Sequence, residues 1–263
     1  MTGRAPHRLL TFAPMIDSET TRLVCRWYGV EFVEDDHLFG WVSLLTLFHG
    51  GYGRAPLLHG GGLRLNGPRP VVDHFDPLAA PSRRLLQTGI QAAGIEADWG
   101  AYNGPLAVDV AVFTYFHLLA DRSLMTPIFA APVPTTEAWL TPRVYPLLRG
   151  LLSLLLQLKP DRAAAAGDRI RTLFAAIDRR LGDGRSFLRG ERLTLGDIAF
   201  AGAAAPLLQP SGYGALMPSV PAMPSPVRTM IDTLRGNATA SYVERVYAAI
   251  PGVARGGHIV QSK

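Results

Sequence analysis

The chain has 263 residues, of which 48% are hydrophobic and 18% are charged, and its formal net charge is +5. This composition is too apolar for a disordered protein, and the length suffices for one large domain or two smaller ones. The basic residues are scattered along the chain instead of clustering on one helix. We therefore expect a solvated basic surface and no nucleic-acid partner.

The cysteine content and the apolar runs bear on the compartment. Cys25 is the single cysteine, which excludes an internal disulfide framework and favours a reducing, cytoplasmic location. The longest apolar stretch, residues 145–158, is shorter than the roughly 20 residues that span a bilayer. The first residues lack the apolar run of a signal peptide. We expect no membrane partner and no export.

The first part of the chain alternates between strand and helix patterns. The short apolar run at residues 8–12 predicts a strand, and residues 18–28 predict a helix that Gly29 ends. Alternating apolar and acidic residues at 30–33 predict a second strand. Together these three elements form a strand-helix-strand unit.

A predicted hairpin and a predicted linker follow. Residues 41–48 are apolar enough for a helix or a strand, and we leave the type open. Residues 56–59 and 63–65, joined by three glycines, predict a β-hairpin, and residues 70–75 predict a short helix. Residues 81–104 are polar and irregular with weak helical character, so we expect a linker there.

Beyond residue 105 the strand signals disappear and the pattern is helical. The predicted helices cover residues 107–122, 144–158, 161–181, 195–208 and 227–250, the last broken at Gly236. The sequence therefore predicts two unlike domains, an α/β domain at residues 1–80 and an all-α domain at residues 105–263, joined by the linker at 81–104.

Four segments, in order, carry a resemblance to a known family. They read SETTRLVCRWYGVEF at 18–32, APLL at 55–58, LNGPRPVVDH at 65–74 and FLRGERLTLGDIAF at 187–200. They resemble the corresponding segments of cytosolic glutathione S-transferases. The resemblance implies a thioredoxin-like α/β N-terminal domain, an all-α C-terminal domain and a cis peptide bond before Pro56.

The last of these segments also has a physical meaning of its own. Thr194 and Asp197 have the spacing of a capping box at the start of a helix. The acidic side chain also favours the positive end of the helix dipole. We assign this pair a structural role.

The resemblance implies an activity and a cofactor. The expected protein is a homodimeric enzyme that uses the thiol of glutathione on an electrophilic or isomerisable hydrophobic small molecule. Such a reaction needs a thiolate at neutral pH, whereas a free thiol has a pKa of about 8.5. A hydrogen-bond donor close to the sulfur is therefore required.

The donor position of the family is unusual in this chain. In the serine and cysteine classes the position falls on Met15, which cannot donate, and in the tyrosine classes it falls on Thr11. Ser18, at the predicted start of the helix, is the nearest alternative. Two roles stay open for Ser18, thiolate stabilisation and simple N-capping of the helix. Thr11, on a strand, is either catalytic or packed.

The cofactor site is expected at residues Ala55, Pro56, Gly67, Pro68 and Arg69. In the family a serine and free amides at the third helix hold the γ-glutamyl carboxylate. Pro68 occupies the serine position and has neither a hydroxyl nor an N–H. Arg69 is either a substitute carboxylate ligand or an ordinary exposed arginine. The main-chain groups of Ala55 depend least on side-chain identity.

The acceptor-substrate pocket is expected between the domains. It would be lined by Met15 and by the helix carrying Phe113, Tyr115, Phe116 and His117. Consecutive helix positions cannot all face one side, so only part of this set reaches the cleft. His117 is either a general base or a hydrogen-bonded structural histidine.

Other chemistries lack support in the sequence. Cys25 lies inside the first helix among apolar neighbours and no C-x-x-C motif exists, which disfavours disulfide exchange. The histidines show no metal-ligand spacing, and no phosphate-binding glycine loop follows a strand. Met15 and Pro68 leave a second hypothesis open, a glutathione-independent lyase, isomerase, biosynthetic enzyme or binding protein on the same scaffold.

Overall fold

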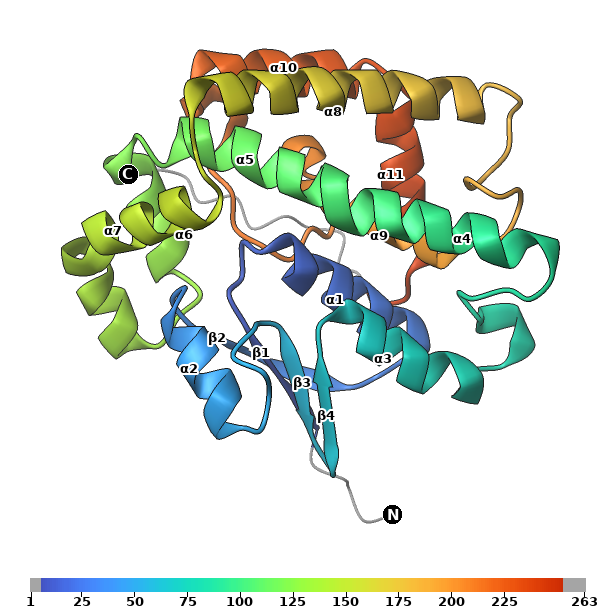
Figure 1. The fold of residues 1–263 in the computed structure, drawn as a ribbon, viewed down its shortest axis with the longest axis horizontal. Helices are drawn as coiled ribbons and strands as arrows, with labels where there is room; N and C mark the ends of the chain where they lie inside the picture. Colours follow the sequence, from blue (N-terminus) through green and yellow to red (C-terminus); the bar gives the residue numbers. More distant parts are fainter. Residues whose placement is uncertain (1–5, 253–263) are drawn as a thin grey trace.

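The structure is a computed structural model that describes residues 6–252, and it consists of a small sheet followed by a helical region (Figure 1). The sheet has the strand order β2-β1-β3-β4, in which β1 pairs parallel with β2 and antiparallel with β3. The strands are β1 (His7–Thr11), β2 (Phe32–Asp36), β3 (Leu57–Gly60) and β4 (Leu63–Asn66). The predicted strand-helix-strand unit and the hairpin are both present.

Three helices accompany the sheet. They are α1 (Ile16–Tyr28), α2 (Trp41–Phe48) and α3 (Pro68–Phe75). The ambiguous segment at 41–48 is a helix that contacts β1, and α1 packs against α3. The sheet and these helices form the lower half of the view in Figure 1.

Two predicted boundaries in this region are wrong. Helix α1 begins at Ile16, because Met15 takes the extended N-cap conformation, so Ser18 is inside the first turn and is not the cap. Strand β2 extends to Asp36 through three acidic residues that its sequence pattern did not reveal. Glu34 and Asp35 tolerate a strand position here because they pair with Arg22 and Arg8.

The segment expected to be an irregular linker is largely ordered. After the short turn η1 (Asp76–Leu78), this segment contains the turn η2 (Pro81–Arg83), the helix α4 (Ile90–Ala101) and the start of a π-helical turn, η3 (Tyr102–Leu106). Helix α4 packs against the central helix of the helical region. Residues 90–101, for which the sequence indicates only weak helical character, therefore form a regular helix, while the domain limits at 80 and 105 stay a prediction.

The helical region has more helices than the sequence pattern predicts. Its elements are α5 (Ala107–Leu118), α6 (Arg122–Ala130), α7 (Thr135–Leu155), α8 (Pro160–Leu181), α9 (Leu195–Leu208), η4 (Val220–Ala222), α10 (Ser225–Arg235) and α11 (Ala238–Ala249). Helix α6 and the first half of α7 were not predicted, because prolines interrupt both helical patterns. Prolines 142 and 146 lie inside α7.

Helix α9 is the centre of the molecule. Every residue from Leu195 to Leu208 is buried, and the helix contacts α1, α4, α5, α10 and α11. Its Gly202 permits a close approach to α1, because a Cβ atom there would lie 2.6 Å from the hydroxyl oxygen of Thr20. The two halves of the chain therefore share one packed interface.

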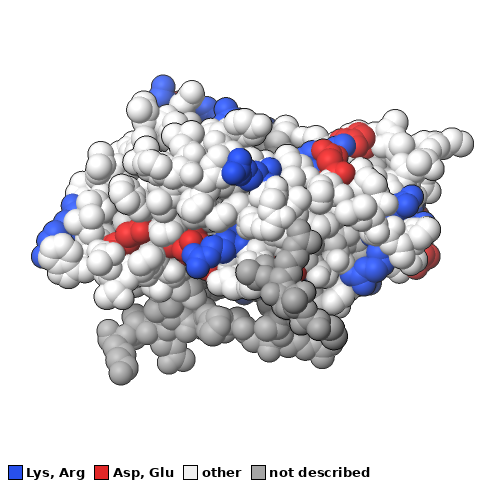
Figure 2. Space-filling model, turned by 90° about the horizontal axis from the view of Figure 1, so that it is seen from below, with Lys and Arg blue, Asp and Glu red and all other residues white. Residues whose placement is uncertain are grey.

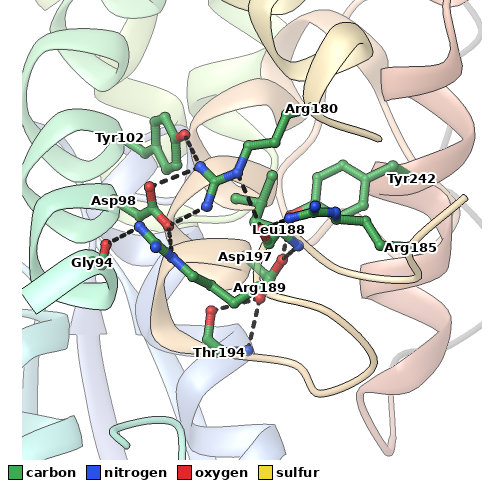
Figure 3. A network of polar contacts seen from close by, with 10 residues as sticks. All are labelled: Gly94, Asp98, Tyr102, Arg180, Arg185, Leu188, Arg189, Thr194, Asp197 and Tyr242. Atoms are coloured by element: carbon green, nitrogen blue, oxygen red, sulfur yellow. Dashed lines mark hydrogen bonds and ion pairs between the residues drawn. The ribbon is translucent and has the colours of Figure 1, made fainter. Parts of the chain in front are cut away.

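The predicted capping box stands at the start of α9. The carboxylate of Asp197 is buried and accepts hydrogen bonds from the main-chain N–H groups of Leu188 and Thr194 at 2.8 and 2.7 Å. It also accepts from the hydroxyls of Thr194 at 2.6 Å and Tyr242 at 2.7 Å. Figure 3 shows how this cluster ties the loop before α9 to α11.

A second buried network joins α1 to α11 and to the segment that follows α9. Glu19 accepts hydrogen bonds from Arg22 at 3.0 Å, from the N–H of Gly214 at 3.1 Å and from the hydroxyl of Tyr247 at 2.8 Å. Arg22, which is fully buried, also donates to Glu34 at 2.9 Å. Each charge is therefore compensated where it is removed from water.

The apolar character of the helices and the distribution of surface charge bear on whether the protein has a membrane or nucleic-acid partner. Among residues 6–252, none of the helices combines the length and the apolar character that crossing a bilayer requires. On the face shown in Figure 2, the Lys and Arg groups are separated by uncharged surface and interspersed with acidic groups.

Candidate functional site

An apolar cavity of about 280 Å³ lies between the β1–α1 loop and the helical region. The loop contributes Phe12, Pro14 and Met15, while the helical region contributes residues of α5, α6, α7 and α9. The apolar lining comprises Phe12, Pro14, Met15, Ile16, Phe39, Ala107, Val108, Ala111, Leu118, Met125, Ile128, Leu152, Leu155, Leu156, Pro206 and Met217. Such a cavity suits a hydrophobic small molecule.

The cavity includes two of the five residues expected to bind substrate. Met15 and Tyr115 line it, whereas Phe113, Phe116 and His117 are not among its lining residues. The ring of His117 instead packs against Phe113 and Phe116, with centroid distances of 4.9 and 5.0 Å. Burial lowers the pKa of His117.

Thr11 and Ser18 lie together beneath the loop and do not line the cavity. Both residues are fully buried. The Thr11 hydroxyl donates to the Ser18 hydroxyl, and Ser18 donates to the carbonyl of Phe12 at 3.1 Å. Both hydroxyl protons are therefore engaged with protein acceptors, and the pair fixes the loop that supplies Phe12 to the cavity.

The segment before β3 has the backbone geometry that the resemblance implied. The bond between Ala55 and Pro56 is cis. The carbonyl of Pro56 accepts from the N–H of Gly67 at 2.8 Å and from the side chain of Asn66 at 2.9 Å, which connects this segment to the start of α3. Within residues 6–252, the main-chain N–H and C=O of Ala55 have no hydrogen-bond partner. They remain available to a ligand.

The start of α3 offers less to an anion than the family pattern suggests. Gly67 is the N-cap with φ +88°, and Pro68 is the first helical residue, where it removes one free N–H. The guanidinium of Arg69 binds Asp73 at 2.7 Å and Glu96 at 2.6 Å. Arg69 therefore already has two carboxylate partners.

Two polar residues of the cavity were missed by the sequence analysis, Asp17 and Asn103. Asp17 lies in the first turn of α1, and Asn103 lies in the π-helical turn η3. Burial raises the pKa of Asp17, and a hydrogen bond from the Asn103 side chain opposes this effect. In the sequence, Asp17 is indistinguishable from an acidic residue that stabilises a helix N-terminus.

Unpaired polar atoms accompany these residues. The Asn103 side-chain oxygen and the Tyr115 hydroxyl are buried and have no hydrogen-bond partner in the described part of the chain. Burial raises the pKa of Tyr115 well above the usual value. A third lining residue, Thr114, donates its hydroxyl to the carbonyl of Val110 at 2.6 Å and is thereby satisfied. No group of three metal-ligating side chains occurs among residues 6–252.

Comparison with known proteins agrees with this geometry. Residues 160–223 match the family model of the glutathione S-transferase C-terminal domain. No curated protein sequence matches the chain. Many solved structures share the fold over most of the chain's length, at low sequence identity.

Three solved structures illustrate the likeness. A glutathione S-transferase from Sinorhizobium meliloti is 17% identical, with 97% of each chain covered and a TM-score of 0.52. Glutathione S-transferase I from maize, in complex with an atrazine glutathione conjugate, is 14% identical, with 95% of this chain and 100% of that chain covered and a TM-score of 0.56. A transferase from Ceriporiopsis subvermispora, in complex with glutathione, is 12% identical, with 92% and 96% covered and a TM-score of 0.53.

The chain thus has the glutathione S-transferase fold, with a mixed four-stranded sheet and a helical C-terminal region. The family-model match lies within α8, α9 and the connections around them, and together with the fold it supports a relationship to the glutathione S-transferase superfamily. At a coarse level, the fold is that of a transferase-like enzyme.

Proposed function

We propose that the protein is an enzyme that uses the thiol of glutathione on a hydrophobic small molecule, either by attack on an electrophile or in an isomerisation or elimination. The observation that carries the proposal is the apolar cavity of about 280 Å³ between the β1–α1 loop and the helices. Its position in this fold supports its assignment as the acceptor-substrate site. Met15 and Tyr115 would contact the substrate, with Phe113, Phe116 and His117 behind or beside them.

Glutathione would bind through the main chain first. The free N–H and C=O of Ala55, next to Pro56, can pair with the backbone of an extended peptide. Gly67, Pro68 and Arg69 at the start of α3 would face the γ-glutamyl carboxylate, with Arg69 exchanging one of its two carboxylate partners for the ligand.

Activation of the thiol would fall to the hydroxyl pair beneath the loop. Ser18 would have to turn its proton from the Phe12 carbonyl toward the sulfur, while Thr11 continues to donate to Ser18. A donated hydrogen bond lowers the thiol pKa because it stabilises the thiolate.

The second candidate function is a glutathione-independent lyase, isomerase, biosynthetic enzyme or binding protein. Three observations favour it. Met15 has no donor for a thiolate, Pro68 has no N–H at the helix start, and Arg69 is already paired with Asp73 and Glu96. In this case the apolar cavity would act without a thiol cofactor.

Calorimetric titration with glutathione separates the two candidates. Binding in the millimolar range or tighter, together with turnover of 1-chloro-2,4-dinitrobenzene, is expected for the first candidate. Absence of binding refutes it. Ser18→Ala should lower turnover, whereas the control Ser186→Ala, on the connection between α8 and α9, should not. Unchanged turnover in Ser18→Ala would remove only the role of Ser18.

We also propose a cytoplasmic homodimer. The unpaired, buried Cys25 suits a reducing compartment. Phe48 and Tyr52 at the end of α2 are 85% and 84% exposed, and exposed aromatic residues of this size are typical of a partner surface. Sedimentation equilibrium should give twice the chain mass of 28.4 kDa. A single-chain mass would contradict the dimer.

A further inference from the structure

The polar end of the cavity has an unusual charge balance. Among the described residues that line the cavity, Asp17 is the one acidic side chain, and none is Arg, Lys or His. The remaining lining is apolar except for Asn103, Thr114 and Tyr115. The cavity therefore places a single carboxyl group at the edge of an apolar space.

Asp17 has no counter-ion in the described part of the chain. No salt bridge includes it, and the influences on its pKa are burial and the hydrogen bond with Asn103. Glu19 and Asp98, by contrast, form ion pairs, Glu19 with Arg22 and Asp98 with Arg180 and Arg189. A cation bound in the cavity would give Asp17 the ionic partner that it lacks.

Two other polar residues of the cavity lining have unpaired atoms. The side-chain oxygen of Asn103 has no partner in the described part of the chain. The Tyr115 hydroxyl also has none. Buried polar atoms without partners are uncommon in folded proteins and indicate an ion, a water molecule or a ligand that pairs with them. A carboxylate and an amide oxygen both accept, so the complementary group must donate.

We propose that the cavity binds an apolar molecule that carries a protonated amine, and that the ammonium group pairs with Asp17. This inference refines the substrate class of the proposed function and rests on that proposal for the assignment of the cavity as the acceptor-substrate site. A cation beside Asp17 offsets the cost of burying the carboxylate, and the apolar body fills the space lined by Met15, Leu118 and Ile128.

Asn103 and Tyr115 line the same cavity as Asp17 and can take part in binding the ammonium group. The π-helical turn that carries Asn103 interrupts the α4–α5 rod at this point, and such turns are frequent at functional sites. The Asn103 oxygen and the Tyr115 hydroxyl supply further acceptors for the ammonium protons after small side-chain adjustments.

The test compares two probes of the same shape, 4-phenylbutylamine and 4-phenylbutanol, by calorimetry on the full-length protein without glutathione. The amine should bind wild type about ten-fold or more tightly than the alcohol, since only the amine forms the ion pair. Asp17→Asn should remove this preference and leave the affinity for the alcohol unchanged. The control Asp161→Asn, in the first turn of α8, should keep the preference.

Equal affinity of wild type for the two probes would overturn the proposal, as would a preference that survives in Asp17→Asn. The wild-type comparison decides the question even if Asp17→Asn does not fold. Asn103→Leu should weaken the amine preference and leave alcohol binding intact. Because glutathione is absent, amine preference without glutathione binding would leave this inference standing and refute the glutathione proposal. Glutathione turnover without amine preference would do the reverse.

Discussion

Replacement of Asp197 by alanine tests the cluster that holds the start of α9. The carboxylate accepts four hydrogen bonds and is fully buried, and α9 is the central helix of the molecule. Alanine removes the acceptor and leaves its donors without partners. Figure 3 shows that no other carboxylate among the residues drawn is bonded to these donors.

The expected loss of folding stability comes from the hydrogen-bond donors that cannot reorient toward another acceptor. The hydroxyls of Thr194 and Tyr242 can rotate, whereas the main-chain N–H groups of Leu188 and Thr194 are fixed. A buried unsatisfied donor costs about 1–3 kcal/mol, so two of them cost about 2–6 kcal/mol. With a urea dependence of about 3 kcal/mol per molar, the unfolding midpoint should fall by about 1–2 M.

Equilibrium urea unfolding followed by circular dichroism measures the effect. Asp183→Ala is the matched control, because Asp183 lies on the same connection between α8 and α9, is exposed and, among residues 6–252, pairs only with Arg185. It should leave the midpoint unchanged. A midpoint of Asp197→Ala that equals that of Asp183→Ala would refute the view that these amides depend on the buried carboxylate.

Three further outcomes test the packing and the buried charges. Burial raises the pKa of Cys25 to about 12, so the native thiol should not react with a disulfide reagent at about pH 8, whereas the urea-unfolded chain should react at once. Burial raises the pKa of Asp36 to about 7, above its value of 3.8 in the unfolded chain. Between these two values the folded state binds a proton that the unfolded chain does not, so the free energy of unfolding should fall as pH rises from about 4 to about 7. In Asp36→Asn this fall should be smaller, as measured by urea midpoints across that range. Gly202→Ala should destabilise the protein by about 1–3 kcal/mol because the new methyl group meets Thr20. Gly150→Ala, on the exposed face of α7, should stabilise the protein by up to about 1 kcal/mol. Thermal unfolding of both variants checks that the two effects have opposite signs.

The sequence predicted those structural elements that are determined by residues adjacent in the chain. The capping box was predictable because the four consecutive residues from Thr194 to Asp197 determine its geometry, and the hairpin because three consecutive glycines, which all have positive φ in the structure, suit a tight turn. Helix α4 and the first half of α7 were not predictable in this way. Their helical state depends on packing, and the contact of α4 with α9 is an example. In α7, packing overrides the preference of proline against a helix interior.

The same distinction applies to the site. Met15 and Tyr115 line the cavity, but the sequence named them together with Phe113, Phe116 and His117 and did not decide which of these residues reach it. Asp17 and Asn103 lie 86 positions apart in the sequence, and no spacing rule connects them. They meet because α1 packs beneath the helical region and because a π-helical turn carries Asn103 at that level.

The adjacent residues Asp17 and Ser18 show how one helix turn can both fix the β1–α1 loop and present a carboxyl group to the cavity. Successive side chains point about 100° apart around a helix, so Ser18 faces the sheet side and bonds the Phe12 carbonyl while Asp17 lines the cavity. The contact that fixes the loop therefore also fixes the carboxyl group. If Ser18→Ala lowers turnover and amine binding together, Ser18 acts by positioning this turn. If it lowers turnover alone, Ser18 acts on the sulfur.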